Sequence, residues 1–70
     1  MIILENISTG QIHEGNEIEF FVDDDTMIGE VYLDSKLIFQ TLDVINEDQL
    51  DHALHSEFRV TKEESEHIYN

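Results

Sequence analysis

The spacing of apolar residues changes near Ile45, and this change constrains the fold more than any other feature of the sequence. From residue 17 to residue 33, apolar and polar side chains alternate in short runs, which is typical of strands with one buried face. The pattern predicts the α+β class, with a small antiparallel β-meander of three to five strands and one C-terminal helix packed on the sheet. The residues after Ile45 that recur at helical spacing and should form the packing stripe of that helix are Leu50, Ala53, Leu54 and Phe58.

Turn residues divide the first two-thirds of the chain into short strands. Gly, Asn, Asp and Ser favour turns because they tolerate left-handed backbone or bond the nearby backbone through their side chains. They cluster between the apolar runs, and the two-residue connection Asp34-Ser35 has the length of a hairpin loop. The strands predicted in this way are residues 1–7, 11–13, 17–22, 27–33 and 36–44.

The predicted helix has a clear start. Asn46 is a favourable N-cap residue, and Gln49 three positions later is its capping-box partner. The helix is therefore predicted over residues 47–58. A second capping box, Thr61-x-x-Glu64, predicts a short second helix over residues 62–69 that carries little apolar surface.

The chain is long enough for a single domain, residues 1–70. A domain of this size buries only about 60% of the surface that its unfolded chain exposes, so its stability should be marginal. A second copy would cover more apolar surface, and we expect a homodimer. Electrostatic repulsion opposes that association, so added salt should tighten the dimer.

The charge of the chain is far from balanced. Seventeen Asp and Glu residues face only Lys36, Arg59 and Lys62, which gives a formal net charge of -14. Ordinary solubility needs a magnitude of roughly 2–8 in a small domain, and the excess destabilises the compact state by self-repulsion. A halophilic or otherwise acidic proteome is one explanation. The other explanation is that the protein binds a basic protein. Nucleic acids and anionic membranes are disfavoured as direct partners, because they carry negative charge as this protein does.

Several other classes are disfavoured by what the sequence lacks. There is no Cys, so disulfides, thiolate catalysis and Cys-type zinc sites are excluded. The longest apolar runs are far too short for a membrane span, and the first residues do not resemble a signal peptide. We therefore expect a cytoplasmic protein, residing in the host cytoplasm if it is encoded by a phage.

The carboxylates are the candidate partner-binding groups. Residues two apart on one face of a strand are separated by about 6.6–6.8 Å, so Glu17 and Glu19 should form a regularly spaced pair. Acidic residues that follow them, and others near the helix start, could extend this pattern into an imitation of phosphate rows. For any single cluster the alternative is a solvated polar face without a partner. The acidic candidates are Glu17, Glu19, Asp23, Asp24, Asp25, Glu30, Asp34, Glu47, Asp48 and Asp51.

Phe21 is the aromatic exception among these candidates. The alternation assigns the other aromatic residues mostly to the core, namely Phe20, Tyr32, Phe39 and Phe58, but Phe21 shares the face of Glu17 and Glu19. A bulge, a sheet covered on both faces, or a contact with a partner would each explain this position. An exposed aromatic residue among acids suits an interface anchor, so Phe21 joins the candidate site.

Metal binding and catalysis have weaker support. The Asp23–Asp25 triplet does not fit the EF-hand pattern. In a loop that begins at Asp23, the position that requires an oxygen ligand is Met27, and the position that requires Gly is Ile28. His52 and His55 share a helical face, yet they are better explained as surface contacts with aspartates four residues earlier. No nucleophile–base pair or phosphate-binding loop is present, so we expect no cofactor, no metal and no enzyme activity.

In size and charge the chain resembles the small phage-encoded DNA-mimic inhibitors, which block nucleases, glycosylases or nucleoid proteins. The resemblance covers no aligned motif and assigns no site residue. It implies an inhibitor that occupies the basic groove of a nucleic-acid-binding protein or nuclease. The alternative is an acidic adaptor or immunity-type protein that binds a basic surface outside any nucleic-acid site. A structural or metal-binding accessory protein is a third class.

The charge imbalance leads to a first testable expectation. The thermal midpoint of unfolding should rise as salt is added from low ionic strength, because salt screens the repulsion between carboxylates. Moderate acidification below neutral pH should act in the same direction by partial protonation. Circular dichroism melts at increasing NaCl concentration measure this, and a midpoint that stays flat or falls would show that repulsion is a minor contribution.

Overall fold

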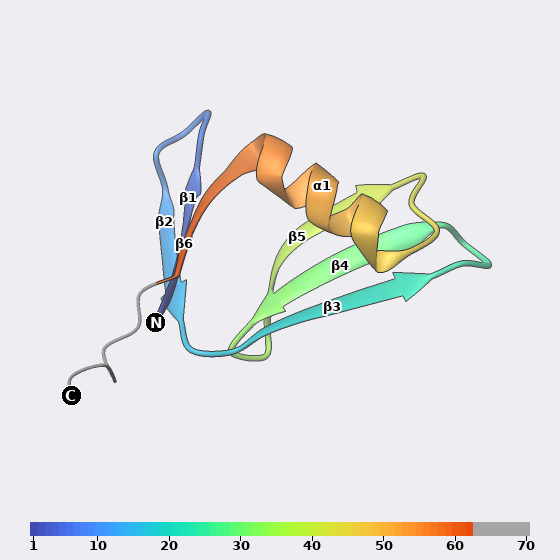
Figure 1. Ribbon diagram of the computed structural model, residues 1–70, viewed down its shortest axis with the longest axis horizontal. Coiled ribbons are helices and arrows are strands. Elements are labelled where there is room, and N and C mark those ends of the chain that lie inside the picture. The colour runs from blue at the N-terminus through green and yellow to red at the C-terminus, as the bar shows by residue number, and fades with distance from the viewer. Residues whose placement is uncertain (63–70) are drawn as a thin grey trace.

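The computed structural model describes residues 1–62 as six strands and one helix (Figure 1). All strand pairs are antiparallel. In chain order the elements are β1 (Ile2–Asn6), β2 (Ile12–Gly15), β3 (Ile18–Asp23), β4 (Ile28–Leu33), β5 (Lys36–Leu42), α1 (Glu47–Glu57) and β6 (Phe58–Lys62).

The strands form two sheets of three, with the orders β2-β1-β6 and β3-β4-β5. The α+β class and a helix packed on an antiparallel sheet are confirmed. The expected single meander of three to five strands differs from this arrangement, because β6 follows the helix and pairs with β1. Each sheet is therefore built around its middle strand, and β1 receives partners from both ends of the described chain (Figure 1).

The segment after the helix accounts for this difference. The sequence pattern predicted that residue 58 ends the helix and that residues 62–69 form another one. Phe58 instead has extended backbone, with φ -129°, and is buried as the first residue of β6. Lys62 is the last residue of that strand, and the remainder of the predicted second helix lies outside the described residues.

The start of α1 follows the predicted cap. The Asn46 side chain accepts a hydrogen bond from the Gln49 backbone N–H at 2.9 Å. The Gln49 side chain in turn accepts one from the Ile45 N–H at 2.8 Å, so it closes the box one residue earlier than the standard pattern. Among residues 1–62, no helix has the length and apolar character needed to cross a membrane.

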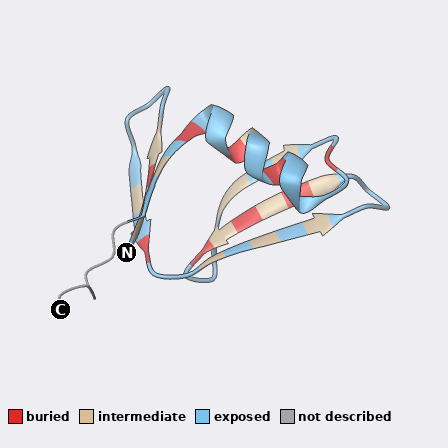
Figure 2. Ribbon diagram, in the orientation of Figure 1, coloured by how far each residue is buried: buried red, intermediate tan, exposed pale blue. Residues whose placement is uncertain are grey.

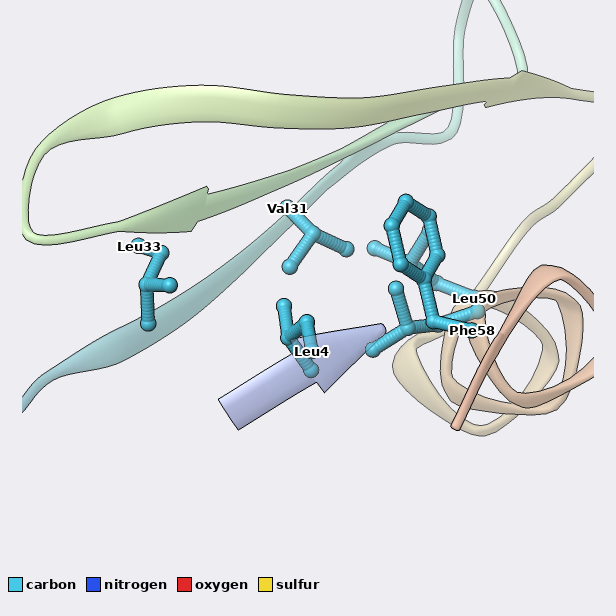
Figure 3. Packing of buried hydrophobic residues seen from close by; sticks show 6 residues of the cluster. Leu4, Val31, Leu33, Leu50 and Phe58 are labelled. Carbon is cyan, nitrogen blue, oxygen red and sulfur yellow. The ribbon is translucent and has the colours of Figure 1, made fainter. Parts of the chain in front are cut away.

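The core lies where the helix and both sheets meet (Figure 3). Leu4 comes from β1, Val31 from β4 and Leu50 from α1, and all three are almost completely buried. Phe58 joins them from β6 and contacts the ring of Phe39 edge-on, with ring centroids 5.8 Å apart. This one cluster therefore holds the two sheets together, and α1 contacts β3, β4, β5 and β6.

Gly29 permits the closest approach between α1 and the β3-β4-β5 sheet. A Cβ atom at this position would lie 2.7 Å from a Val44 methyl carbon and 2.8 Å from Leu50 Cδ1. Both neighbours are buried, so neither can move aside without disturbing the core. A side chain of any size at Gly29 would push the helix away from β4.

Replacing Gly29 by Ala should therefore destabilise the protein. Overpacking of a core costs about 1–3 kcal/mol, which exceeds the gain of about 0.4–1 kcal/mol from a less flexible unfolded chain. Urea unfolding should show a lower midpoint for Gly29→Ala. Gly10→Asn is the control, because Gly10 has open space around it and Asn tolerates its φ of 78°. Equal midpoints for Gly29→Ala and wild type would contradict this packing.

Candidate functional site

The β3-β4-β5 sheet has one covered and one open face. Buried and half-buried residues alternate along β4 (Figure 2). Val31 and Leu33 are buried against the core on the covered face, and the residues between them belong to the opposite face. On that opposite side Phe21 is 52% exposed and Leu42 is 65% exposed. We call it the outer face. It consists of Glu19, Phe21 and Asp23 from β3, Ile28, Glu30 and Tyr32 from β4, and Leu37, Gln40 and Leu42 from β5.

A bulge in β5 decides which of its side chains reach the outer face. Val31 pairs with Phe39, but the next residue, Tyr32, pairs with Leu37, so Ile38 has no partner of its own in β4. An extra residue of this kind shifts the alternation of the bulged strand. Ile38 and Phe39 both pack against the core as a result, and Leu37 lies on the outer face at 45% exposure.

Four residues form a block of alternating carboxylates and aromatic rings on this face. The register pairs Glu19 with Tyr32 and Phe21 with Glu30 across β3 and β4. The two aromatic rings occupy one diagonal of the block and touch edge-on, with centroids 5.5 Å apart and planes 84° apart. The two carboxylates occupy the other diagonal. We call Glu19, Phe21, Glu30 and Tyr32 the quartet.

The quartet has internal order. The Tyr32 hydroxyl donates a hydrogen bond to Glu30 Oε1 at 3.1 Å. This bond, with smaller contributions from burial and from the charge of Glu30, raises the pKa of Tyr32. The Tyr32 hydroxyl thus holds the Glu30 carboxylate in place.

Two shallow hollows flank Phe21. The larger, of about 480 Å³, is lined by the quartet and Ser35. The smaller, of about 340 Å³, lies on the other side of Phe21 and has Glu30, Ile28 and Gln40 in its wall. Phe21 thus stands as a ridge between two depressions, with the Glu30 carboxylate reachable from both.

The β3–β4 turn carries the three consecutive aspartates. Asp23 Oδ1 accepts hydrogen bonds from the backbone N–H groups of Asp25, at 3.0 Å, and Thr26, at 3.4 Å. The turn closes with Met27 in left-handed backbone, φ 61°. Asp23 therefore shapes the turn, whereas Asp24 and Asp25 extend the acidic surface beyond the end of the outer face.

Asp34 also has a structural task. Asp34 and Ser35 form the two-residue β4–β5 hairpin loop, both with positive φ, as the type I′ turn requires. Asp34 Oδ1 accepts hydrogen bonds from the N–H groups of Asn16, at 3.0 Å, and Glu17, at 2.9 Å. These bonds lower the pKa of Asp34, that from Glu17 most. Glu17 precedes β3, whereas Glu19 lies within it. The expectation that these two residues form a pair on one strand is therefore wrong.

The acids of the helix form a separate group. Glu47 and Asp48 lie in the first turn of α1, where the helix dipole favours negative charge, and Asp51 follows one turn later. They border a hollow of about 200 Å³ beside Phe20, whose side chain is on the covered side of β3. The predicted site is therefore divided between two sides of one sheet.

Two groups were considered as metal ligands. Carboxylate oxygens of Asp23, Asp24 and Asp25 lie within 4.8 Å of one another on the exposed turn, and they are the one such group among residues 1–62. One of these oxygens, Asp23 Oδ1, already accepts two backbone hydrogen bonds within the turn. The predicted surface contact of His55 with Asp51 is confirmed, because its Nδ1 lies 3.4 Å from Asp51 Oδ1 on the same helix. The corresponding contact of His52 with Asp48 does not occur in the described part of the chain.

Sequence reasoning missed Tyr32 and Leu37 as site residues. It grouped Tyr32 with the core aromatics. Tyr32 is two residues after Glu30 and therefore shares its strand face, so the alternation was sufficient to place it on the outer face. The position of Leu37 depends on the β5 bulge, which leaves no recognisable pattern in the sequence. Phe21 lies on the face of Glu19 as predicted, and its exposure excludes a sheet covered on both faces at this position.

The chain matches no protein-family model, no curated protein and no solved structure.

The hydrogen bonds of Asp34 predict a pH-dependent contribution to stability. A depressed carboxyl pKa means that the ionised group stabilises the fold above its ordinary pKa, near 3.8, and that this contribution disappears as pH falls through the lower folded-state value. Asp34→Asn keeps the acceptor oxygen and tolerates the turn, but it removes the charge. Thermal melts from pH 7 to pH 2 should show wild type above this variant at neutral pH, with the difference vanishing in acid.

Asp24→Asn serves as the control for Asp34→Asn. It removes one charge from the β3–β4 turn, at the other end of β4, and should stabilise slightly, or change nothing, because repulsion decreases. A difference between Asp34→Asn and wild type that stays constant across the whole pH range would contradict the proposed role of the Asp34 carboxylate.

Proposed function

We propose that this protein is a non-enzymatic inhibitor that occupies the basic groove of a nucleic-acid-binding protein. In this proposal the outer face and the adjoining β3–β4 turn take the place of nucleic-acid phosphates. The observation that carries it is a set of five carboxylates on one side of the molecule, with no Lys or Arg within ion-pair distance of them among residues 1–62: Glu19, Asp23, Asp24, Asp25 and Glu30.

The position of the basic residues supports this reading. Arg59 and Lys62 belong to β6 in the other sheet, and Lys36 lies at the β4–β5 hairpin. The outer face is consequently a region of uncompensated negative potential. Such a field steers a positively charged partner into contact and raises the association rate.

The shape of the face supports binding rather than catalysis. Its hollows are open and shallow, and the carboxylates along it are mostly exposed. A catalytic acid or base usually needs a shifted pKa in a cleft, produced by burial or a close charge. The pKa shifts of Tyr32 and Asp34 are explained by hydrogen bonds that organise the quartet and a turn.

A second function is favoured by a different observation. Apolar side chains accompany the acids on the outer face, and Phe21, Ile28 and Leu42 have no counterpart in a row of phosphates. Their presence favours an acidic adaptor or immunity-type protein, which binds a basic protein surface elsewhere. Both functions use the same face, so they differ in whether nucleic acid is excluded.

Competition separates the two functions. The partner is captured from lysate on the immobilised protein, eluted with salt and identified, and labelled duplex or single strand is then titrated against the complex. The inhibitor should displace nucleic acid with a stoichiometry of one per groove. Simultaneous binding of both ligands, without loss of nucleic-acid affinity, would eliminate the inhibitor and leave the adaptor.

Charge variants locate the face in the same assay. Glu19→Gln combined with Asp25→Asn removes two charges from the proposed interface and should slow association about 3- to 10-fold at low salt. Glu14→Gln combined with Glu57→Gln removes two charges from other surfaces and should change the rate much less. Equal effects of the two pairs, measured by stopped flow, would mean that the net charge matters and the outer face does not.

A further inference from the structure

We propose that the quartet is a subsite for an arginine side chain of the partner. The proposal rests on the proposed function only in that the partner is basic, and it specifies which basic side chain the outer face receives. The guanidinium would lie in the larger hollow, between the carboxylates of Glu19 and Glu30 and against the rings of Phe21 and Tyr32.

The first argument is that Glu30 is partly buried and its carboxylate has no cationic partner among the described residues. It lies on β4, the central strand of its sheet, with Phe21 opposite on one side and Gln40 opposite on the other. Its residue is only partly exposed, and in the described part of the chain no basic side chain is within 4.0 Å of its carboxylate. A carboxylate that has lost part of its hydration is stabilised when a cation pairs with it.

The second argument is the fixed orientation of this carboxylate. The Tyr32 hydroxyl holds Oε1 at 3.1 Å, which satisfies one of roughly four acceptor positions of a carboxylate. The remaining positions are open to an incoming donor. A prearranged acceptor loses less conformational freedom on binding than a mobile one, so the affinity per hydrogen bond is higher.

The third argument is the geometry of the block. Directly opposed side chains on antiparallel strands have Cβ atoms about 4.5–5.5 Å apart, and same-face neighbours along a strand are about 6.6–6.8 Å apart. A planar guanidinium above the quartet is therefore within reach of both carboxylates and both rings. Phe21 contacts the Tyr32 ring edge-on and is 52% exposed, so part of its ring surface is open to a ligand in the hollow.

Arginine fits this chemistry better than lysine. The guanidinium is planar, can pair with a carboxylate through two parallel hydrogen bonds, and stacks on an aromatic face. The lysine ammonium is a compact, strongly hydrated charge that pairs with carboxylates but gains less from a flat aromatic surface. An aromatic–carboxylate block on an open sheet face thus selects between the two cations, whereas isolated carboxylates do not.

Other occupants of the face are disfavoured by charge. A nucleic acid has the same sign as the five carboxylates. A second copy of this chain would bring another formal charge of -14 against the first, and its Arg59 would have to reach the hollow from the edge of a different sheet. A basic partner that presents arginine is the occupant whose charge complements the face.

The test compares two probes of equal charge. Capped tetra-arginine and tetra-lysine peptides are titrated into the full-length ¹⁵N-labelled protein, and the dissociation constants and chemical-shift changes are measured by NMR. Wild type should bind the arginine peptide about 2- to 5-fold more tightly, which corresponds to a cation–π contribution at an exposed site. The largest shifts should occur at the quartet residues.

Variants assign the preference to the quartet. Phe21→Leu keeps an apolar side chain but removes the ring, and Glu30→Gln removes the charge with little change of shape; each should reduce the arginine preference towards equal affinity. Glu19→Gln is the second carboxylate variant in case Glu30→Gln alters the sheet, which thermal melts would reveal. Glu14→Gln, on β2 of the other sheet, should weaken both peptides by the same factor and keep the preference.

Equal wild-type affinity for the two peptides would overturn the subsite. So would chemical-shift changes centred on the helix acids Glu47, Asp48 and Asp51 instead of the quartet. Failure of the subsite and failure of the proposed function are distinguishable, because the peptide titration contains no nucleic-acid-binding protein. An arginine preference without displacement of nucleic acid would support the subsite and contradict the inhibitor. Displacement of nucleic acid without an arginine preference would support the inhibitor and contradict the subsite.

Discussion

The structure depends on one small apolar cluster that joins the two sheets and the helix. Each sheet has only three short strands, so the apolar side chains of each are buried mainly against the other sheet and α1. Leu4 supplies the side chain from one sheet and Val31 from the other, while Leu50 and Phe58 close the space between them (Figure 3). No polar or charged side chain is buried among the described residues, so this cluster stabilises the fold without paired charges.

The position of α1 explains why the outer face is open. This helix covers the side of the β3-β4-β5 sheet that carries Val31 and Leu33. Within residues 1–62 no helix or strand covers the opposite side of the same strands, and its side chains are a mixture of acids, aromatics and aliphatics. In this arrangement a carboxylate, that of Glu30, lies at the middle of the face, and the aromatic and aliphatic side chains lie around it.

The acidic residues divide into two kinds according to what their carboxylates contact. Asp23 accepts backbone hydrogen bonds within the β3–β4 turn, and Asp34 accepts them from Asn16 and Glu17 in the β2–β3 connection. Glu47 lies where the helix dipole favours an anion. These acids have structural tasks in the fold. Asp24 and Asp25 protrude from a turn, and Glu19 and Glu30 form the acidic diagonal of the quartet, so their charges are directed outward. The repulsion among them opposes folding and would be relieved by a basic partner.

Local features of the sequence were enough to determine the α+β class, the Asp34-Ser35 hairpin loop, the Asn46 cap and the outward direction of Phe21. Each of these depends on residues adjacent in the chain or on the two-residue period of a strand, which is why pattern alone identifies them. The tertiary structure decided that there are two sheets, that Phe58–Lys62 pairs with β1, and that the β5 bulge turns Leu37 outward. It also decided that Glu47, Asp48 and Asp51 lie away from the outer face. These outcomes depend on contacts between distant segments, and a strand's partner is chosen by which apolar faces can be buried together, which no local pattern records.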